Sequence, residues 1–409
     1  MTMPGENTPT IYLARQPVYD RRLRVFGYEL LYRRADCDSA GVVNREESAQ
    51  TLVRAIADIG LERLVCGLPA FINIPSYLLS DPALELLPKD RVIFEILEET
   101  EPTSEALTAA HSLAEKGYRL ALDDFVIGSA QEEFLSACKI VKLDLMANKS
   151  HAIPAGLQKL KKERLRVLAE KVETMTAYAR CQALGFDYFQ GYFFARPDIV
   201  SSRGVPASRS VLIHLLTRLQ EPKVTISELE ELVSADVTLT YRLLRLVNSA
   251  CLSVNREIDS VRTALMVIGI ERVVALVSLL AMSGVQDKPS ELMVTAMIRA
   301  KMCEGVATAL GFDNTQTHFT LGLLSVLEAM FDTPMSVLVE QLPLVPELRA
   351  ALVDPNASGP LAETLRIALR FEAGRWEELE DTLARARAIS ESYVGAVTWA
   401  DDAKMALAA

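Results

Sequence analysis

The sequence has few of the residues that mark disulfide, zinc or redox centres. Its six cysteines are scattered over 409 residues, at positions 37, 66, 138, 181, 251 and 303, without the Cys-x-x-Cys spacing of such sites. Four histidines occur, at positions 111, 151, 214 and 318, and none is followed by aspartate. We therefore expect reduced, mostly buried thiols in a cytoplasmic protein.

An excess of basic residues and long apolar runs are also absent. The formal net charge of -11 disfavours nucleic acid as a partner, because phosphate binding needs a basic face. The polar N-terminus MTMPGENTPT lacks the features of a secretory signal. The longest apolar stretch, VVALVSLLAMSGV, is shorter than the roughly 20 residues of a membrane-spanning helix. A soluble protein without a membrane partner is expected.

Polar residues close a series of short apolar runs in the first half of the chain. The runs are FGYELL, AFINI, VIFEIL, RLALDD, IVKLD, RVLAEKV and DYFQGYFF. The polar residues are Glu29, Asn73, Glu95, Asp123, Asp124, Lys142, Glu170 and Gln190. They recur at intervals of roughly 20 to 45 residues, as expected if each lies at the top of a successive barrel strand.

Helical segments alternate with these runs and then replace them. ESAQTLVRAIADIG, at 47–60, PTSEALTAAHSLAEKG and TMTAYARCQALG have apolar residues at three- and four-residue spacing. Strand and helix therefore alternate, which predicts a parallel sheet closed into a barrel. The segment DIVSSRGVPAS, at 198–208, has the composition of a linker. Beyond it ISELEELVSA, TLTYRLLRLVNSA and SVRTALMVIGIERVVALVSLLA predict helices. We expect a barrel in residues 1–200 and an all-helical domain in 201–409.

Five of the polar residues that close the strands are carboxylates. Gathered at one barrel mouth they would repel, at about 4 kcal/mol for each close pair at an effective dielectric constant of about 20. Divalent cations would relieve this repulsion. Carboxylates with the amide oxygen of Asn73 form an all-oxygen set, which suits Mg or Mn rather than zinc. Two such cations can hold the attacking water and the leaving oxygen of a phosphodiester. The residues indicate a metal-dependent site.

The motifs carry a family resemblance. RQPVYDRRLRVFGYELLYR, FINIPS, FEILEE, LALDDF, VKLD, LAEKVET and LGFDYFQGYFFARP, between Ile11 and Pro197, together resemble the EAL domain family of cyclic di-GMP phosphodiesterases. The stretch from SADVTLTYRLLRLVNSA through IDSVRTALMVIGIERV is similar to an HDOD domain. The resemblance implies a modified (β/α)8 TIM-type barrel followed by a helical domain, as in two-domain EAL-HDOD signalling proteins.

The resemblance also implies a role for each candidate residue. The metal ligands would be Glu29, Asn73, Glu95, Asp123 and Asp124, with Glu170 as general base, Lys142 orienting the attacking water, Gln190 and Arg33 on the substrate, and Glu98 supporting the loop after Asp124. Two Mg or Mn ions would serve hydrolysis of cyclic di-GMP to linear pGpG. The HDOD half would regulate the barrel or relay its state to a protein partner, and a homodimer is the implied assembly.

Departures from the family pattern leave an alternative open. Val126 and Lys171 stand where the family commonly has glycine, and the signature triplet reads Glu29-Leu30-Leu31. The alternative is a weak or inactive EAL domain that acts as a cyclic di-GMP sensor or a scaffold. Taken singly, Lys142 would pair with Asp144, Arg33 would be a surface charge, Glu98 and Glu99 a solvated turn, and an Asp or Asn after a strand a helix cap.

The second half lacks the ligands of an HD metallohydrolase. These enzymes need histidines and an adjacent His-Asp pair to hold metals, and the sequence gives GLLSV at 322–326 where GLLHD would be expected. For Asn248 and Ser249 two interpretations remain, either positions in a packed helix or a capping or partner-binding role.

Overall fold

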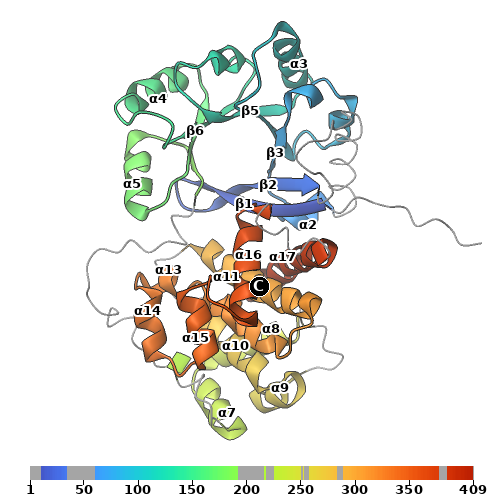
Figure 1. The fold of residues 1–409 in the computed structure, drawn as a ribbon, viewed down its shortest axis with the longest axis vertical. Coiled ribbons are helices and arrows are strands. Elements are labelled where there is room, and N and C mark those ends of the chain that lie inside the picture. The colour runs from blue at the N-terminus through green and yellow to red at the C-terminus, as the bar shows by residue number, and fades with distance from the viewer. Residues whose placement is uncertain are drawn as a thin grey trace, which may run out of the picture. The chain divides into compact units, whose positions relative to one another are not determined.

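The computed structural model describes residues 11–34, 60–191, 216–217, 225–249, 252, 258–282, 289–376 and 385–408. The chain forms two compact units, which Figure 1 shows as a ribbon. The first comprises Met1–Phe193 and Glu372–Trp376, and the second comprises Phe194–Phe371 and Glu377–Ala409. The predicted domain boundary at residues 200 and 201 and the predicted linker at 198–208 lie outside the described residues.

The first unit is a closed barrel of eight strands that follow one another in chain order. The strands are β1 Ile11–Asp20, β2 Val25–Arg34, β3 Ala70–Ile74, β4 Val92–Ile96, β5 Arg119–Phe125, β6 Ile140–Asp144, β7 Arg166–Glu170 and β8 Tyr188–Phe189. Strand β1 is antiparallel to β2 and β8, whereas the neighbouring pairs from β2 to β8 are parallel. The predicted modified (β/α)8 barrel is confirmed.

The antiparallel first strand departs from the all-parallel sheet expected from the sequence. A turn of four residues, 21–24, joins β1 to β2, and it is too short for the crossover that a parallel pair needs. The Asp20 carboxylate closes the turn by accepting hydrogen bonds from the backbone nitrogens of Arg22, at 2.7 Å, and Arg24, at 3.0 Å. The hairpin therefore follows from local turn chemistry.

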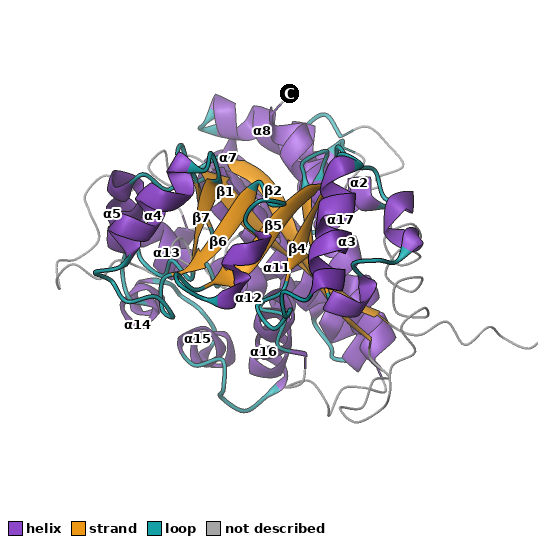
Figure 2. Cartoon of the chain, turned by 90° about the horizontal axis from the view of Figure 1, so that it is seen from above, coloured by secondary structure: helices purple, strands orange, loops and turns teal. Residues whose placement is uncertain are grey.

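Helices surround the strands on the outside, as Figures 1 and 2 show for α3, α4 and α5. The helices of this unit are α2 Leu61–Val65, α3 Ser104–Glu115, α4 Ile153–Lys162 and α5 Met175–Leu184, with 3-10 helices η1 Ser76–Leu78, η2 Pro82–Leu86 and η3 Ala130–Phe134. Thr103 and Thr174 cap α3 and α5 by accepting from backbone nitrogens three residues later. The helices expected from PTSEALTAAHSLAEKG and TMTAYARCQALG are confirmed, while residues 47–59 of the third expected helix lie outside the described residues.

The second unit consists of helices and connecting loops, with no strand among its described residues. Its helices are α7 Ile226–Ser234, α8 Val237–Val247, α9 Val261–Ile268, α10 Ile270–Met282, α11 Ser290–Leu310, α12 Thr315–Leu324, α13 Leu327–Phe331, α14 Met335–Leu338, η5 Val339–Gln341, α15 Pro346–Val353, α16 Pro360–Glu372 and α17 Ala386–Ala408. The long helical stretch predicted around residues 260–281 is broken at Gly269, whose φ of 88° no helix can contain. The all-helical expectation is confirmed.

Asn248 has a structural role at the end of α8. Its side-chain amide donates to the carbonyl of Ile258 at 2.7 Å, and its oxygen accepts from the Ile258 nitrogen at 2.8 Å. This pair of bonds ties the end of α8 to the chain ten residues later. Asn248 Nδ2 also donates to the carbonyl of Leu244 at 2.8 Å, so these contacts favour the helix-capping interpretation of Asn248.

The length and apolar composition of the helices bear on whether the chain could cross a membrane. Within the described residues, no single helix is both long and apolar enough to cross a membrane, although one bent pair, Thr315–Phe331 with Met335–Gln341, meets the criteria of length and composition at an angle of 110°.

Candidate active site at the barrel mouth

An apolar layer inside the barrel positions the candidate site. The layer takes one residue from each strand, and because these residues come from all sides of the barrel they meet in its interior. They are Val18, Phe26, Phe71, Ile93, Ala121, Ile140, Leu168 and Tyr188. Side chains two positions apart on a strand point to the same face. The residues two positions after six of them are Asn73, Glu95, Asp123, Lys142, Glu170 and Gln190. A polar layer therefore lies directly above the apolar one, at the carboxyl ends of the strands.

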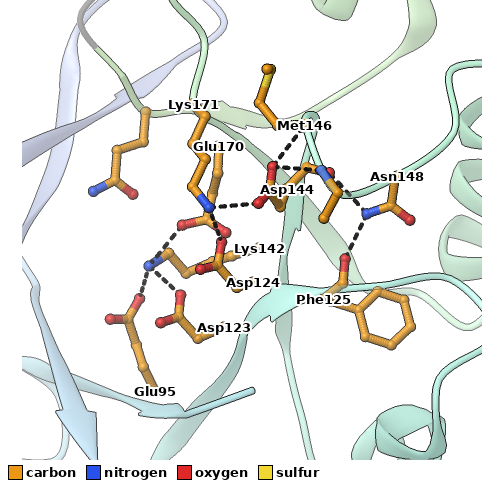
Figure 3. Close-up of polar contacts among 12 residues, drawn as sticks. Glu95, Asp123, Asp124, Phe125, Lys142, Asp144, Met146, Asn148, Glu170 and Lys171 are labelled. Carbon is orange, nitrogen blue, oxygen red and sulfur yellow. Dashed lines mark hydrogen bonds and ion pairs between the residues drawn. The ribbon is translucent and has the colours of Figure 1, made fainter. Parts of the chain in front are cut away.

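Lys142 lies at the centre of this polar layer, 1% exposed. Its ammonium makes ion pairs with four carboxylates, as Figure 3 shows for three of them. The distances from Lys142 Nζ are 3.1 Å to Glu29 Oε2, 2.7 Å to Glu95 Oε1, 2.6 Å to Asp123 Oδ1 and 3.2 Å to Glu170 Oε1. The alternative interpretation, in which Lys142 pairs only with Asp144, is wrong, because the Asp144 carboxylate contacts Lys171 instead.

Two amide side chains complete the surroundings of Glu29. Asn73 Nδ2 donates to Glu29 Oε1 at 3.0 Å, and Gln190 Nε2 donates to Glu29 Oε2 at 2.6 Å. The Glu29 carboxylate thus accepts from both neighbours as well as from Lys142. Residues from β2, β3 and the end of β8 meet at one carboxylate, as they would at one end of a closed barrel.

A break in the strand register brings both adjacent aspartates to the mouth. In a regular strand Asp123 and Asp124 would point to opposite faces. Between Leu122 and Phe125 the register of β5 with β6 shifts, and Asp124 has a left-handed φ of 41°. Such a bulge re-aims a side chain. Asp123 consequently contacts Lys142, while Asp124 contacts Lys171 at 3.0 Å.

Three further residues, none of them among the predicted site residues, shape the mouth of the barrel. Lys171 bridges Asp124 and Asp144, and Asn148 ties together the loops that follow β5 and β6. Asn148 Nδ2 donates to the carbonyls of Phe125 and Asp144 at 2.8 Å, while its oxygen accepts from the Ile127 nitrogen at 2.9 Å. The sequence could have identified Asp144 as a site residue, because it lies two positions after Lys142 on the same strand. Asn148 offers no such signal.

The electrostatics of the layer are dominated by burial and by the single ammonium. Burial opposes the charge of Lys142, yet the surrounding carboxylates hold its pKa well above the usual value. Burial alone would raise the pKa of Glu29, but Lys142 and the two amides keep it below its usual value. Burial raises the pKa of Glu170 to about 8, against the attraction of Lys142. Burial, aided by Glu29, raises the pKa of Glu95 well above its usual value.

This charge balance fits a site for further cations. One ammonium cannot neutralise four buried carboxylates, and burial together with this excess of negative charge raises the pKa values of Glu95, Asp123 and Glu170. Among the described residues of this layer, five buried side-chain oxygens have no hydrogen-bond partner, namely Asn73 Oδ1, both carboxylate oxygens of Glu95, Glu170 Oε2 and Gln190 Oε1. Within the described residues no group of three or more acidic, histidine or cysteine side chains is arranged to hold a metal ion. Four of the carboxylates contact the Lys142 ammonium instead. The all-oxygen donor set suits Mg or Mn.

One predicted site residue, Glu98, lies outside this cluster, and the side chain of another, Arg33, is not among the described residues. Arg33 lies on β2, where its backbone pairs with Tyr12, and its side chain is outside the described residues. Glu98 is exposed beyond the end of β4, and its backbone carbonyl accepts from Gln131 Nε2 at 2.7 Å. Gln131 follows the loop after Asp124, so the contact to that loop runs through the Glu98 backbone.

Two protein families match, one within each half of the chain. The EAL domain matches residues 69–197, and the HDOD domain matches residues 205–331.

Similar proteins share both halves. Cyclic di-GMP phosphodiesterase CdgJ of Vibrio cholerae serotype O1 is 34% identical over 385 residues, which cover 92% of this chain and 88% of that protein. The uncharacterized protein YuxH of Bacillus subtilis is 28% identical over 403 residues, covering 95% and 98%. Among solved structures, the manganese and cyclic di-GMP complex of Klebsiella pneumoniae BlrP1 at pH 9.0 is 22% identical, covers 48% of this chain and 57% of that chain, and has a TM-score of 0.39.

Proposed function

Because the chain belongs to the family of proteins that join an EAL domain to an HDOD domain, we propose that it hydrolyses cyclic di-GMP to linear pGpG with two divalent cations. The observation that carries this proposal is the convergence of strand-end carboxylates and amides around Lys142 at one end of a closed barrel. The curated relative CdgJ, which shares both halves, is a cyclic di-GMP phosphodiesterase by name.

The cations would be held by oxygen ligands of the polar layer together with the carboxylates of Glu29 and Asp124. The proposed ligands are Glu29, Asn73, Glu95, Asp123 and Asp124. When bound, Mg or Mn would neutralise the carboxylates, lower the pKa of a bound water and polarise a phosphate oxygen. The unpartnered oxygens of Asn73 and Glu95 support this assignment, since each is buried and has capacity for a ligand.

The remaining residues of the layer would act on the water and the substrate. Glu170 would take a proton from the attacking water as general base, because its carboxylate lies 3.2 Å from Lys142 Nζ and its Oε2 has no hydrogen-bond partner within the described residues. The Lys142 ammonium would orient that water and offset charge that develops on the phosphate. Gln190, already hydrogen-bonded to Glu29, would close the site on the substrate, and Arg33 would contact a phosphate.

A hydrolysis assay tests the proposal. The full chain with cyclic di-GMP and Mn²⁺ or Mg²⁺ should give the linear product, and Glu29→Ala should abolish it. Glu85→Ala is the matched control, because Glu85 makes an exposed ion pair with Lys116 away from the polar layer. Absence of product at high protein concentration with both metals would overturn the proposal.

A second candidate is a cyclic di-GMP sensor without turnover. The observation in its favour is the ion pair of Lys171 with Asp124, which engages a proposed metal ligand. A sensor should show heat of binding for cyclic di-GMP in calorimetry while the assay above gives no product. Calorimetry without heat of binding would exclude the sensor.

The helical half would regulate the barrel or relay its state to a protein partner. Comparing hydrolysis by the full chain and by residues 1–200 measures that contribution. Residues 372–376 belong to the barrel unit, where Trp376 stacks on Tyr12 with ring centroids 6.0 Å apart. The fragment lacks this contact, so Trp376→Ala in the full chain is the necessary control. Equal rates in all three proteins would argue against regulation in cis.

A further inference from the structure

Lys171 places a second ammonium at the barrel mouth, separate from Lys142. It is the first residue after β7, and its Nζ lies 3.0 Å from Asp124 Oδ1 and 2.5 Å from Asp144 Oδ2. Figure 3 shows it between these two carboxylates, whereas Lys142 contacts a different set. The end of β7 is thereby joined electrostatically to the ends of β5 and β6.

The backbone at both ends of this contact is strained. Asp124 has a φ of 41° and Lys171 a φ of 54°, in the left-handed region that residues with a Cβ rarely adopt. Such conformations persist where surrounding contacts hold them, and they gather at functional sites. The ion pair joins the two left-handed residues directly. The Lys171 ammonium is therefore held beside Asp124 although both residues have unfavourable backbone conformations.

Backbone hydrogen bonds hold the Asp144 carboxylate in place, and Asp144 in turn holds the Lys171 ammonium. Asp144 Oδ1 accepts from the backbone nitrogens of Met146, at 2.6 Å, and Ala147, at 3.1 Å, which leaves Oδ2 for Lys171. The Asp144 side chain is 8% exposed, while Lys171 is 48% and Asp124 30% exposed. Asp144 thus anchors the ammonium, and Asp124 is the partly solvated carboxylate within its reach.

We propose that the Lys171 ammonium is a built-in counter-ion that weakens binding of a divalent cation at Asp124. The inference rests on the proposed function, in which Asp124 serves the second cation. A divalent cation at Asp124 must share this carboxylate with the ammonium or displace it, and like charges repel at that distance. Lys171 is a positioning residue, since it acts through Asp124.

Calorimetric titration of the full chain with Mn²⁺ alone tests this role without any turnover. Lys171→Gly removes the charge and suits the positive φ, so the variant should fold and bind Mn²⁺ about three- to fivefold tighter, the range for a partly exposed charge pair. Lys171→Ala should show the same gain while keeping the backbone strain. Lys171→Arg keeps a cation and should bind like the parent.

Arg164→Gly is the matched control. Arg164 is also a cationic residue with positive φ, 61°, but it precedes β7 at the opposite end of the barrel. Its loss should leave Mn²⁺ affinity unchanged. The proposal is overturned if Lys171→Gly binds Mn²⁺ no tighter than the parent, if only the glycine variant and not the alanine variant gains affinity, or if no protein binds Mn²⁺.

The outcome is separable from that of the proposed function. If Mn²⁺ affinity rises in Lys171→Gly but neither protein yields linear product, the counter-ion role stands and the hydrolase proposal fails. If the parent hydrolyses cyclic di-GMP and the variants bind Mn²⁺ equally, only the counter-ion role fails.

Discussion

Lys142 is a single residue on which the burial of four carboxylates depends. Replacing Lys142 by methionine keeps the apolar stem and removes the charge. We expect the free energy of unfolding of the barrel to fall by about 3 to 5 kcal/mol, because uncompensated charges remain in a buried place. Urea unfolding followed by the fluorescence of Trp376 measures this loss. Added Mn²⁺ should recover more stability in the variant than in the parent.

Lys116→Met provides the comparison for this substitution. Lys116 pairs with Glu85 at 2.7 Å, but both side chains are nearly half exposed, so we expect a change of at most about 1 kcal/mol. Equal losses in the two variants would contradict the view that Lys142 compensates buried charge.

In the helical unit, Glu304 is a buried charged residue that, like Lys142 in the barrel, is surrounded by side chains of opposite charge. Its carboxylate accepts from Arg272 Nη1 and Lys301 Nζ, each at 2.6 Å, and from Gln316 Nε2 at 3.0 Å. Burial opposes its charge, but Lys301 and Arg272 hold the pKa of Glu304 below its usual value. The carboxylate therefore joins α10, α11 and α12 as an anion.

The pKa of Glu304 sets the pH dependence of this contribution. Because the folded-state pKa is lowered, the stabilisation is complete above the unfolded value of about 4.3 and is lost as pH falls through the folded value. Glu304→Gln should therefore cost about 2 kcal/mol at pH 7 and progressively less below about pH 4. Urea unfolding followed by Trp399 checks this. Glu391→Gln, at an exposed pair with Arg387, should show no comparable loss.

At the scale of elements, the junction of β7 and β8 controls where Gln190 lies. Gly191 has a φ of 143°, and a Cβ on it would lie 2.2 Å from the carbonyl oxygen of Val172. The Val172 nitrogen donates to the Gln190 carbonyl at 3.0 Å. Close backbone approach at Gly191 thus holds the amide of Gln190 against Glu29.

Gly191→Ala should force these strand ends apart. We expect a loss of about 2 to 3 kcal/mol in the free energy of unfolding, and a loss of hydrolysis, because Gln190 moves away from Glu29. Gly128 has a φ of 85°, and a methyl group added there would meet no atom of the described residues within 4 Å. Gly128→Ala should therefore cost about 1 kcal/mol from backbone strain alone. Equal losses in both variants would show that steric contact with Val172 is unimportant.

At the scale of the whole molecule, each unit contains one of the two tryptophans. Trp376 stacks on Tyr12 in the barrel unit, and Trp399 packs edge-on against Phe319 in the helical unit, with centroids 5.7 Å apart. Variants Trp399→Phe and Trp376→Phe therefore report separately on the two units.

Metal binding should distinguish the two units. Mn²⁺ at about a hundred times its dissociation constant should stabilise the unit reported by Trp376 by about 2.7 kcal/mol, because the ligand binds the folded barrel. The transition reported by Trp399 should shift by less than half as much. Thermal unfolding with and without Mn²⁺ measures both, and equal shifts would mean that the two units unfold as one.

Much of the fold and the candidate site could be read from the sequence because strand geometry is local. Asn73, Glu95 and Glu170 each close an apolar run, which places them near the ends of their strands, and each lies two positions after a residue that the structure shows in the inner apolar layer. The antiparallel β1 was not expected, although the turn after Asp20 contains its signal. Neither pattern requires knowledge of a distant contact.

The sequence by itself determined the order of the strands, the helices between and after them, and the inward polar layer, since these depend on residues near one another in the chain. Tertiary structure decided which charges pair. Lys142 and Asp144 are two positions apart, yet their partners are remote residues, and Lys171 reaches across two strand ends. Such pairing depends on the register shift at Asp123 and Asp124 and on barrel closure, which bring together groups that no local pattern relates.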